Sequence, residues 1–118
     1  MPCEVINVSG NLISVRITGE LKKAELDQMQ TTTAEFMRKE GKIRILVSLH
    51  NFLGWEKGAE WEDTSFQSKH DSDIEKIAIV GDEKWMNLAL AFSGKPFRPV
   101  EIKYFTPSQL ELAHAWIA

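Results

Sequence analysis

Residues 74–85 have the sequence Ile-Glu-Lys-Ile-Ala-Ile-Val-Gly-Asp-Glu-Lys-Trp, in which an aliphatic run leads directly into the start of a helix. The aliphatic run at residues 74–80 is typical of a strand that is covered on both faces of a sheet. A glycine and an aspartate follow it, and residues 83–93 have the pattern of a helix. A strand, a helix and a further strand in succession require a crossover connection, so a parallel sheet is predicted.

The rest of the chain continues this alternation of strands and helices. Apolar residues in alternating or continuous runs predict strands over residues 3–8, 11–18, 43–49, 74–80 and 100–105. Helical spacing and capping signals predict helices over residues 22–39, 55–70, 83–93 and 107–118. The expected order is β-β-α-β-α-β-α-β-α. We therefore predict a single α/β domain over residues 1–118, with about four helices on a mostly parallel sheet that opens with a β-hairpin.

Length and composition exclude several classes of protein. The chain has 118 residues, of which 43% are hydrophobic and 26% charged, as in an average soluble domain. This composition excludes a disordered tail, a collagen-like repeat and a bare coiled coil. The net charge of −3 gives no basic footprint for nucleic acid. The longest apolar run is far shorter than the roughly 20 residues that span a bilayer, and residues 1–20 show no signal-peptide pattern.

Cysteine and histidine usage gives no metal or cofactor motif. Cys3 is the single cysteine, so an internal disulfide is impossible and a cytoplasmic location is expected. We interpret Cys3 as a small hydrophobic residue rather than a reactive thiol, because no base or cation lies near it in the sequence. His50, His70 and Asp71 match no metal-ligand spacing. No glycine-rich phosphate-binding motif or nucleophile pattern is present, so we expect neither a cofactor nor an enzyme.

The element order with its opening hairpin resembles the STAS domain, and several motifs are similar to those of the SpoIIAA-like family. The motifs are Phe52-Leu53-Gly54-Trp55, Trp61-Glu62-Asp63, residues 77–85, Tyr104-Phe105 and residues 112–116. The resemblance covers almost the whole chain. It implies a STAS-like α/β fold that is related in shape to the CRAL-TRIO lipid-binding fold. It also implies a small-molecule or lipid role with membrane contact.

One motif of the true anti-sigma-factor antagonists is missing. The true antagonists carry a phosphorylatable serine within an Asp-Ser-Ser-Gly-like turn after the third strand, so the resemblance would imply such a serine at the matching position here. Here residues 48–55 read Ser-Leu-His-Asn-Phe-Leu-Gly-Trp, without that motif. We therefore do not expect the phosphorylation switch or the sigma-factor role.

The predicted helix at residues 83–93 is apolar over more than half of its circumference. Trp85, Leu88, Ala89 and Phe92 fall within one arc, and a second apolar arc, formed by Met86 and Leu90, lies beside it. A helix on one face of a sheet needs an apolar stripe only somewhat wider than about 100°. The surplus surface has four interpretations: a neighbouring helix, an apolar ligand, a second subunit or a membrane.

The predicted helix at residues 55–70 places a carboxylate among aromatic residues. Trp55 and Phe66 share one face with Glu62 between them, while Trp61 points about 120° away. Glu62 either orients the polar group of a ligand or forms a salt bridge at the rim. We hypothesise that this helix and the one at residues 83–93 form a lid over an apolar pocket. The predicted lining residues are Trp55, Glu62, Phe66, Trp85, Leu88 and Phe92.

The leading hypothesis is a non-enzymatic binding protein for a small apolar or amphipathic, lipid-like molecule. Basic residues lie near the apolar helix, a pattern that favours binding to anionic lipid. The hypothesis therefore includes a transient, peripheral association with the membrane. The predicted membrane or interface residues are Trp61, Lys84, Met86, Leu90, Lys95 and Arg98. The alternative hypothesis is a STAS-type protein-interaction module that binds a partner, or forms a homodimer, through the surface of helix 83–93.

Overall fold

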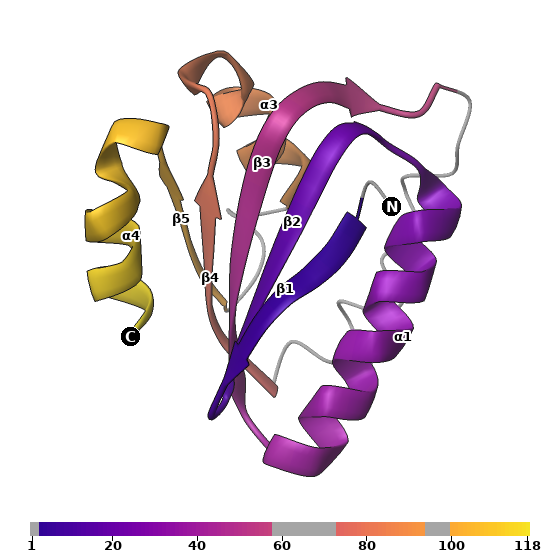
Figure 1. Cartoon of the computed structure of the whole chain (residues 1–118), viewed down its shortest axis with the longest axis vertical. Coiled ribbons are helices and arrows are strands. Elements are labelled where there is room, and N and C mark those ends of the chain that lie inside the picture. The colour runs from indigo at the N-terminus through magenta and orange to yellow at the C-terminus, as the bar shows by residue number, and fades with distance from the viewer. Residues whose placement is uncertain (1–2, 58–72, 94–99) are drawn as a thin grey trace.

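Five strands form one sheet in a computed structural model that describes residues 3–57, 73–93 and 100–118 (Figure 1). The strands lie side by side in chain order: β1 (Cys3–Ser9), β2 (Leu12–Leu21), β3 (Ile43–Trp55), β4 (Ile74–Val80) and β5 (Glu101–Phe105). β1 is antiparallel to β2, and every later neighbouring pair is parallel. The predicted hairpin and the mostly parallel sheet are therefore confirmed.

Helices cover both faces of this sheet. Helix α1 (Lys23–Glu40) lies on one face and helix α4 (Leu110–Ile117) on the other (Figure 1). The short helix α3 (Met86–Ser93) follows the 3-10 turn η2 (Glu83–Trp85), and α4 follows the 3-10 turn η4 (Pro107–Gln109). Within the described residues there are three α-helices, against about four expected from the sequence. Most of the fourth, predicted over residues 55–70, falls on residues 58–70, outside the described part.

The side chains of each strand point alternately to the two faces of the sheet, and this produces two separate hydrophobic clusters. The larger cluster draws on every strand and on α1; its fully buried members include Ile13, Leu21 and Ile43. The smaller cluster lies under α4 and contains Leu46, Ala78, Val80, Phe105, Ala113 and Ile117. Because successive side chains of a strand point to opposite faces, neighbouring residues such as Ile77 and Ala78 belong to different clusters.

β3 is the element that departs most from the sequence prediction. It was expected to end at residue 49, but it continues to Trp55, so Trp55 belongs to a strand and not to the start of a helix. The cause is long-range pairing, because β2 continues beside it until Leu21 faces Trp55. Positive φ angles at Asn51 (50°) and Gly54 (103°) accompany the arch of this end of the strand (Figure 1).

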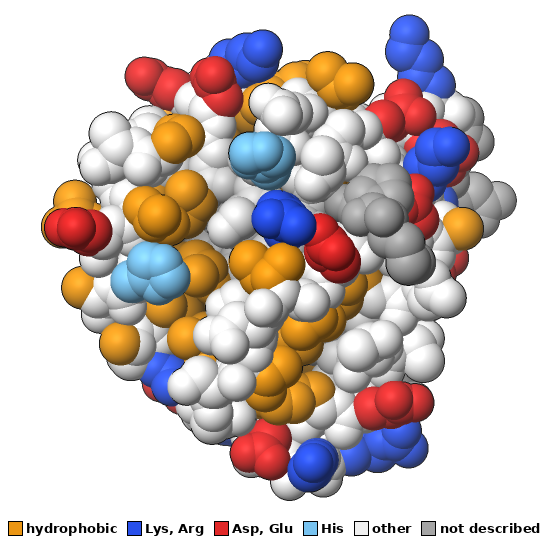
Figure 2. All heavy atoms as spheres, viewed as in Figure 1, with side chains coloured by type: hydrophobic (Ala, Val, Ile, Leu, Met, Phe, Trp, Pro, Cys, Tyr) orange, Lys and Arg blue, Asp and Glu red, His pale blue; other side chains and the backbone are white. Residues whose placement is uncertain are grey.

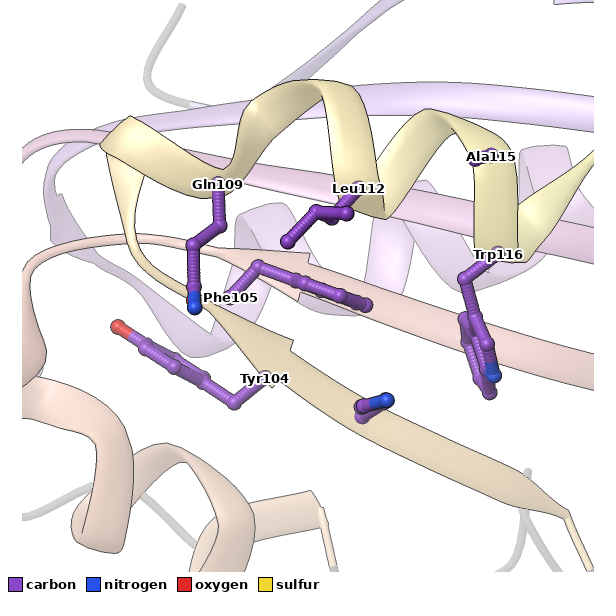
Figure 3. Close-up of a pocket in the computed structure, with 7 residues that line it drawn as sticks. Tyr104, Phe105, Gln109, Leu112, Ala115 and Trp116 are labelled. Carbon is purple, nitrogen blue, oxygen red and sulfur yellow. The ribbon is translucent and has the colours of Figure 1, made fainter.

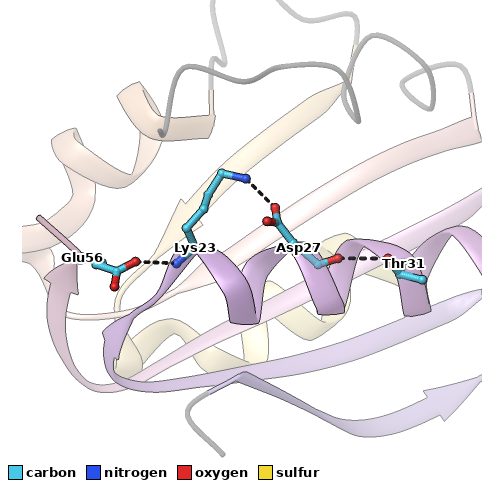
Figure 4. A network of polar contacts seen from close by, with 4 residues as sticks. All are labelled: Lys23, Asp27, Thr31 and Glu56. Carbon is cyan, nitrogen blue, oxygen red and sulfur yellow. Dashed lines mark hydrogen bonds and ion pairs between the residues drawn. The ribbon is translucent and has the colours of Figure 1, made fainter. Parts of the chain in front are cut away.

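Glu56, just after β3, connects the arched end of this strand to the first turn of α1 through a hydrogen bond. Its Oε1 accepts a hydrogen bond from the Lys23 N–H at 3.1 Å (Figure 4). Lys22 occupies the N-cap position of α1 and makes no side-chain cap, so Glu56 satisfies a helix N–H from a distant part of the chain. The Glu56 N–H in turn donates to the Leu21 carbonyl at 2.9 Å. The Lys23 ammonium pairs with Asp27 one turn later at 2.5 Å.

Arg44 joins three parts of the fold at the opposite end of β3. Its guanidinium donates to the Ile117 carbonyl at the end of α4 and to Asn11 Oδ1 in the hairpin turn, the latter at 2.7 Å. The Arg44 N–H also donates to the Asn11 carbonyl at 2.9 Å. These contacts hold the last turn of α4 against the sheet.

We predict that Arg44→Met lowers the free energy of unfolding by about 2 kcal/mol, because it removes two charge-assisted hydrogen bonds and keeps the aliphatic stem. The matched control is Arg16→Met, which breaks the exposed ion pair with Glu4 on the same sheet. Exposed pairs contribute little, so the control should change stability far less. Urea unfolding followed by circular dichroism measures both, and equal losses would contradict this role of Arg44.

Candidate functional site

Three aromatic side chains meet at the carboxyl end of the sheet. Phe52 and Trp55 come from the arched end of β3, and Trp85 comes from η2. Their ring centroids lie 5.1 Å (Phe52–Trp55), 5.0 Å (Phe52–Trp85) and 6.0 Å (Trp55–Trp85) apart, each pair edge to face. Edge-to-face pairs contribute about 0.5–1.5 kcal/mol each beyond the burial of area. Two predicted ligand residues, Trp55 and Trp85, are thus brought together from segments 30 positions apart.

Phe52 belongs to this cluster and was absent from the predicted site. Only 6% of its surface is exposed, and it packs in the larger hydrophobic cluster. The sequence analysis placed it after the strand, where no face could be assigned to it. Extending the strand through residue 55 would have given Phe52 an inward position opposite the exposed Leu53.

The backbone conformation of Gly54 favours glycine where Trp85 packs on β3. Its φ of 103° lies in the region that side-chain-bearing residues rarely adopt. A Cβ at this position would lie 3.4 Å from Trp85 Cη2, an ordinary contact distance, so the constraint is the φ angle and not a lack of space. Two motifs quoted for the family resemblance, Phe52-Leu53-Gly54-Trp55 and residues 77–85, therefore meet in one packing unit.

Gly81 and Tyr104 pack closely against each other at the same carboxyl end of the sheet. A Cβ on Gly81 would lie 2.6 Å from Tyr104 Oη and 3.0 Å from Leu49 Cβ. The Tyr104 hydroxyl donates to the Asp82 carbonyl at 2.8 Å, and the Gly81 N–H donates to the Phe105 carbonyl at 2.9 Å. The Asp82 carboxylate accepts the Lys84 N–H at 3.0 Å and so begins η2. Asp82 is thus explained as a helix cap.

The outward face of α3 differs from the one that the sequence predicts. One apolar arc through Trp85 and Leu88 was expected from an α-helix that begins at residue 83. Residues 83–85 instead form a 3-10 turn, and α3 begins at Met86. Leu88 is 55% exposed, while Leu90 packs against the larger cluster with Trp85. Met86 is half-buried, and the exposed Lys84 holds its ammonium 5.7 Å from the centre of the Trp85 ring.

The remaining predicted residues lie beyond what the structure describes. Glu62, Phe66, Trp61, Lys95 and Arg98 fall within residues 58–72 and 94–99, and the side chain of Phe92 is also outside the described part. The lid hypothesis rests mainly on these residues, so it stays a prediction.

A groove of about 440 Å³ lies between β5 and α4, and it contains none of the predicted site residues. Figure 3 shows side chains from both elements around it. Its lining residues are Lys103, Tyr104, Phe105, Gln109, Leu112, Ala115 and Trp116. The groove could not be predicted, because a groove between two elements depends on their relative position, which no local sequence pattern encodes. Two leucines of α4 are exposed, Leu110 at 42% and Leu112 at 60%, and Leu112 lines the groove.

A further apolar surface lies on β1, the strand at the other edge of the sheet. Val5, Ile6 and Val8 are 36%, 48% and 52% exposed. In the same view as Figure 1, Figure 2 shows surface hydrophobic side chains interrupted by charged ones. Beside this stretch, Glu4 and Arg16 form an ion pair, and the register shifts between Val5 and Asn7. Charges and bulges of this kind discourage strand pairing at an edge.

Cys3 is buried on β1. Burial raises the pKa of its thiol to about 11, and the nearby carboxylates of Glu25 and Glu4 add to the effect. The thiol therefore stays protonated at neutral pH, in agreement with its interpretation as a small hydrophobic residue.

Among the described residues there is no group of three or more His, Cys, Asp or Glu side chains arranged to hold a metal ion. None of the described helices has the length and apolar character needed to cross a membrane.

Fold and motifs together define a single class of protein, an α/β domain of the STAS type. A SpoIIAA-like family profile matches residues 12–118, and the chain belongs to that family. The fold is similar to that of an uncharacterised protein from Shewanella loihica PV-4, whose crystal structure is described as having a SpoIIAA-like fold. The TM-score is 0.71 at 20% identity, over 98% of this chain and 92% of that one. A search of curated proteins gave no significant match. This type of fold supports a regulatory or protein-interaction module.

We predict that Gly81→Ala lowers the free energy of unfolding by about 1–3 kcal/mol, the usual cost of overpacking. The new methyl group would meet Tyr104 Oη and Leu49. In a Tyr104→Phe background the oxygen is gone, so the same substitution should cost less. A double-mutant cycle in urea measures the difference, and strict additivity of the two substitutions would contradict direct contact between the two residues.

A second prediction concerns the ionisation of Tyr104, the single tyrosine of the chain. Burial and the nearby Asp82 carboxylate raise the pKa of its phenol from 10.0 to about 12. Because this pKa is higher in the folded than in the unfolded chain, its contribution to stability is complete below pH 10 and is lost as the pH rises toward 12.

Absorbance of the phenolate near 295 nm follows this group alone. We expect a native midpoint well above that of the chain in guanidinium chloride, which serves as the control. A native midpoint equal to the denatured one would show that Tyr104 is solvated and does not hold Asp82.

Proposed function

We propose that this protein is a non-enzymatic binding protein for a small apolar or amphipathic, lipid-like molecule. The observation that carries the proposal is the cluster of Phe52, Trp55 and Trp85, whose rings meet at the carboxyl end of the sheet. Open α/β sheets bind ligands at this edge, and small-molecule sites are mostly lined by apolar and aromatic side chains. Glu62, Phe66, Leu88 and Phe92 complete the proposed lining, with Glu62 as the group that orients the polar end of the ligand.

Transient association with an anionic membrane is part of this proposal. Leu53 on β3 is 74% exposed, and Leu88 on α3, the helix that follows η2, is 55% exposed. Lys84 is exposed at the start of the same helical segment. Apolar side chains next to basic ones favour the surface of an anionic bilayer. Trp61, Met86, Lys95 and Arg98 are the further proposed contacts, whereas Leu90, which the sequence also suggested, packs against the larger hydrophobic cluster.

We predict that protein purified from its own host carries a discrete small molecule, seen by native mass spectrometry as an added mass. Leu88→Glu should lower the occupied fraction by roughly tenfold, because it puts a charge where apolar contact is needed. Leu88 is exposed, so this substitution spares the core, whereas Trp85→Ala would disrupt the aromatic cluster. The matched control is Leu110→Glu, a leucine of α4 that is 42% exposed and should leave occupancy unchanged.

The membrane part is tested with vesicles of phosphatidylglycerol and, as a comparison, of phosphatidylcholine. Binding should be confined to the anionic vesicles, weaken with added salt and fall with Lys84→Glu. A protein that carries no small molecule and ignores both kinds of vesicle would contradict the proposal.

A protein-interaction module of the STAS type is the second candidate function, and the exposure of Leu88 also favours it. In that case the surface of residues 83–93 would bind another chain. Sedimentation measurements separate the two functions: a ligand-free dimer that Leu88→Glu dissociates, with Leu110→Glu still dimeric, would support the interaction module. A ligand-bearing monomer supports the binding protein.

A further inference from the structure

The groove between β5 and α4 follows the outer edge of β5. Three consecutive residues of the strand, Lys103, Tyr104 and Phe105, line it. Consecutive side chains of a strand point to opposite faces of the sheet, so a groove confined to one face would touch only alternate residues. Figure 3 shows Tyr104 and Phe105 on opposite sides of the strand. The groove therefore reaches from the α4 side across the edge itself.

The edge of β5 offers backbone hydrogen-bonding groups. Among the described residues, β5 is the last strand of the sheet and pairs only with β4. An edge strand presents a row of outward N–H and C=O groups that can pair with a further strand. A backbone in extended conformation matches such a row, and the acyl chain of a lipid has no groups to match it.

The wall on the α4 side supplies apolar contacts. The rings of Phe105 and Trp116 lie with their centroids 6.0 Å apart. Leu112, also on α4, is 60% exposed beside them. An apolar side chain of an added strand that points toward α4 would bury these groups. Peptides added to a sheet edge gain affinity from the backbone and specificity from such alternate side-chain contacts.

The one charged side chain that lines the groove is Lys103. Its ammonium lies 5.5 Å from the centre of the Phe105 ring, and no carboxylate lines the groove. Lys76 lies on β4 outside this lining, with its ammonium 5.1 Å from the centre of the Trp116 ring and a hydrogen bond to the Trp116 carbonyl at 3.2 Å. Glu101 of β5, the in-register neighbour of Lys76, is also outside the lining. Lys103 forms no ion pair within the described residues, so its charge is complementary to an acidic side chain of an occupant.

We propose that this groove docks an extended peptide segment of a partner protein, added as a strand beside β5. An apolar side chain of the segment packs against Leu112 and Trp116, and an acidic side chain two residues away faces Lys103. The site shares no residue with the aromatic cluster. The proposal is therefore independent of the proposed ligand function, and its test uses different variants.

The probe is the peptide acetyl-Glu-Thr-Val-Thr-Glu-amide, which has the same side-chain order in either strand direction. Titrated into the ¹⁵N-labelled full chain, it should shift the amide signals of Lys103–Phe105 and the indole N–H of Trp116. A dissociation constant on the order of 1 mM is expected of so short a probe. The same peptide N-methylated at its three central amides, which removes their hydrogen-bond donors, should not bind.

Two exposed positions test the contacts without touching the core. Leu112→Glu should weaken binding roughly tenfold, and Leu110→Glu, outside the groove, is its matched control. Lys103→Glu should reverse the preference, so that acetyl-Lys-Thr-Val-Thr-Lys-amide binds better than the glutamate peptide. Reversal by a single substitution is a result that unfolding or general weakening cannot produce.

Four outcomes would overturn the proposal. Equal binding of the N-methylated peptide would indicate a groove for small apolar molecules. Signals of β5 that shift with protein concentration alone would indicate a second copy of this chain as the occupant. Binding to phosphatidylglycerol vesicles that Leu112→Glu abolishes would indicate a membrane contact. Absence of localised shifts up to about 5 mM peptide would show that the edge does not accept a strand.

Discussion

The parallel ladder between β2 and β3 runs from the Leu12–Arg44 pair to the Leu21–Trp55 pair, and both surfaces of interest follow from it. At its far end the ladder carries β3 beyond the length that its aliphatic run suggests. Glu56 then ties the strand end to α1 through the Lys23 N–H. This fixed, arched end is what puts Phe52 and Trp55 where Trp85 can pack on them. At its near end the same strand provides Arg44, which holds α4 in place.

The residues that carry the resemblance to the family mainly form packing contacts between strands and helices. Gly54 supplies the positive φ of the β3 end on which Trp85 packs, and Gly81 gives Tyr104 room against β4. Neither glycine needs a ligand to explain it. These motif residues therefore pack the carboxyl edge of the sheet, and exposed side chains such as Leu53 and Leu88 lie around them.

Tyr104 links the two candidate surfaces. Its ring lines the groove beside β5, while its hydroxyl holds the Asp82 carbonyl at the start of η2, three residues before Trp85. The aromatic cluster and the peptide groove are thus separate in composition and connected through one hydrogen bond. The fold supports a regulatory or protein-interaction module, and the two proposed surfaces would give such a module separate sites for a ligand and for a partner protein.

The sequence by itself determined the order of the five strands and of the described helices, the opening hairpin and the mostly parallel sheet, because strand period, helix spacing and crossover connections are local or topological signals. It also singled out Trp55 and Trp85, although it assigned Trp55 to a helix. Only the tertiary structure decided that Trp55 is in a strand, since pairing with β2 outweighs the local pattern. Packing against the sheet likewise decided that Leu90 is turned toward the larger hydrophobic cluster and that Leu88 faces outward. The groove between β5 and α4 could not be predicted, because it exists only once Arg44 has fixed the helix against the sheet.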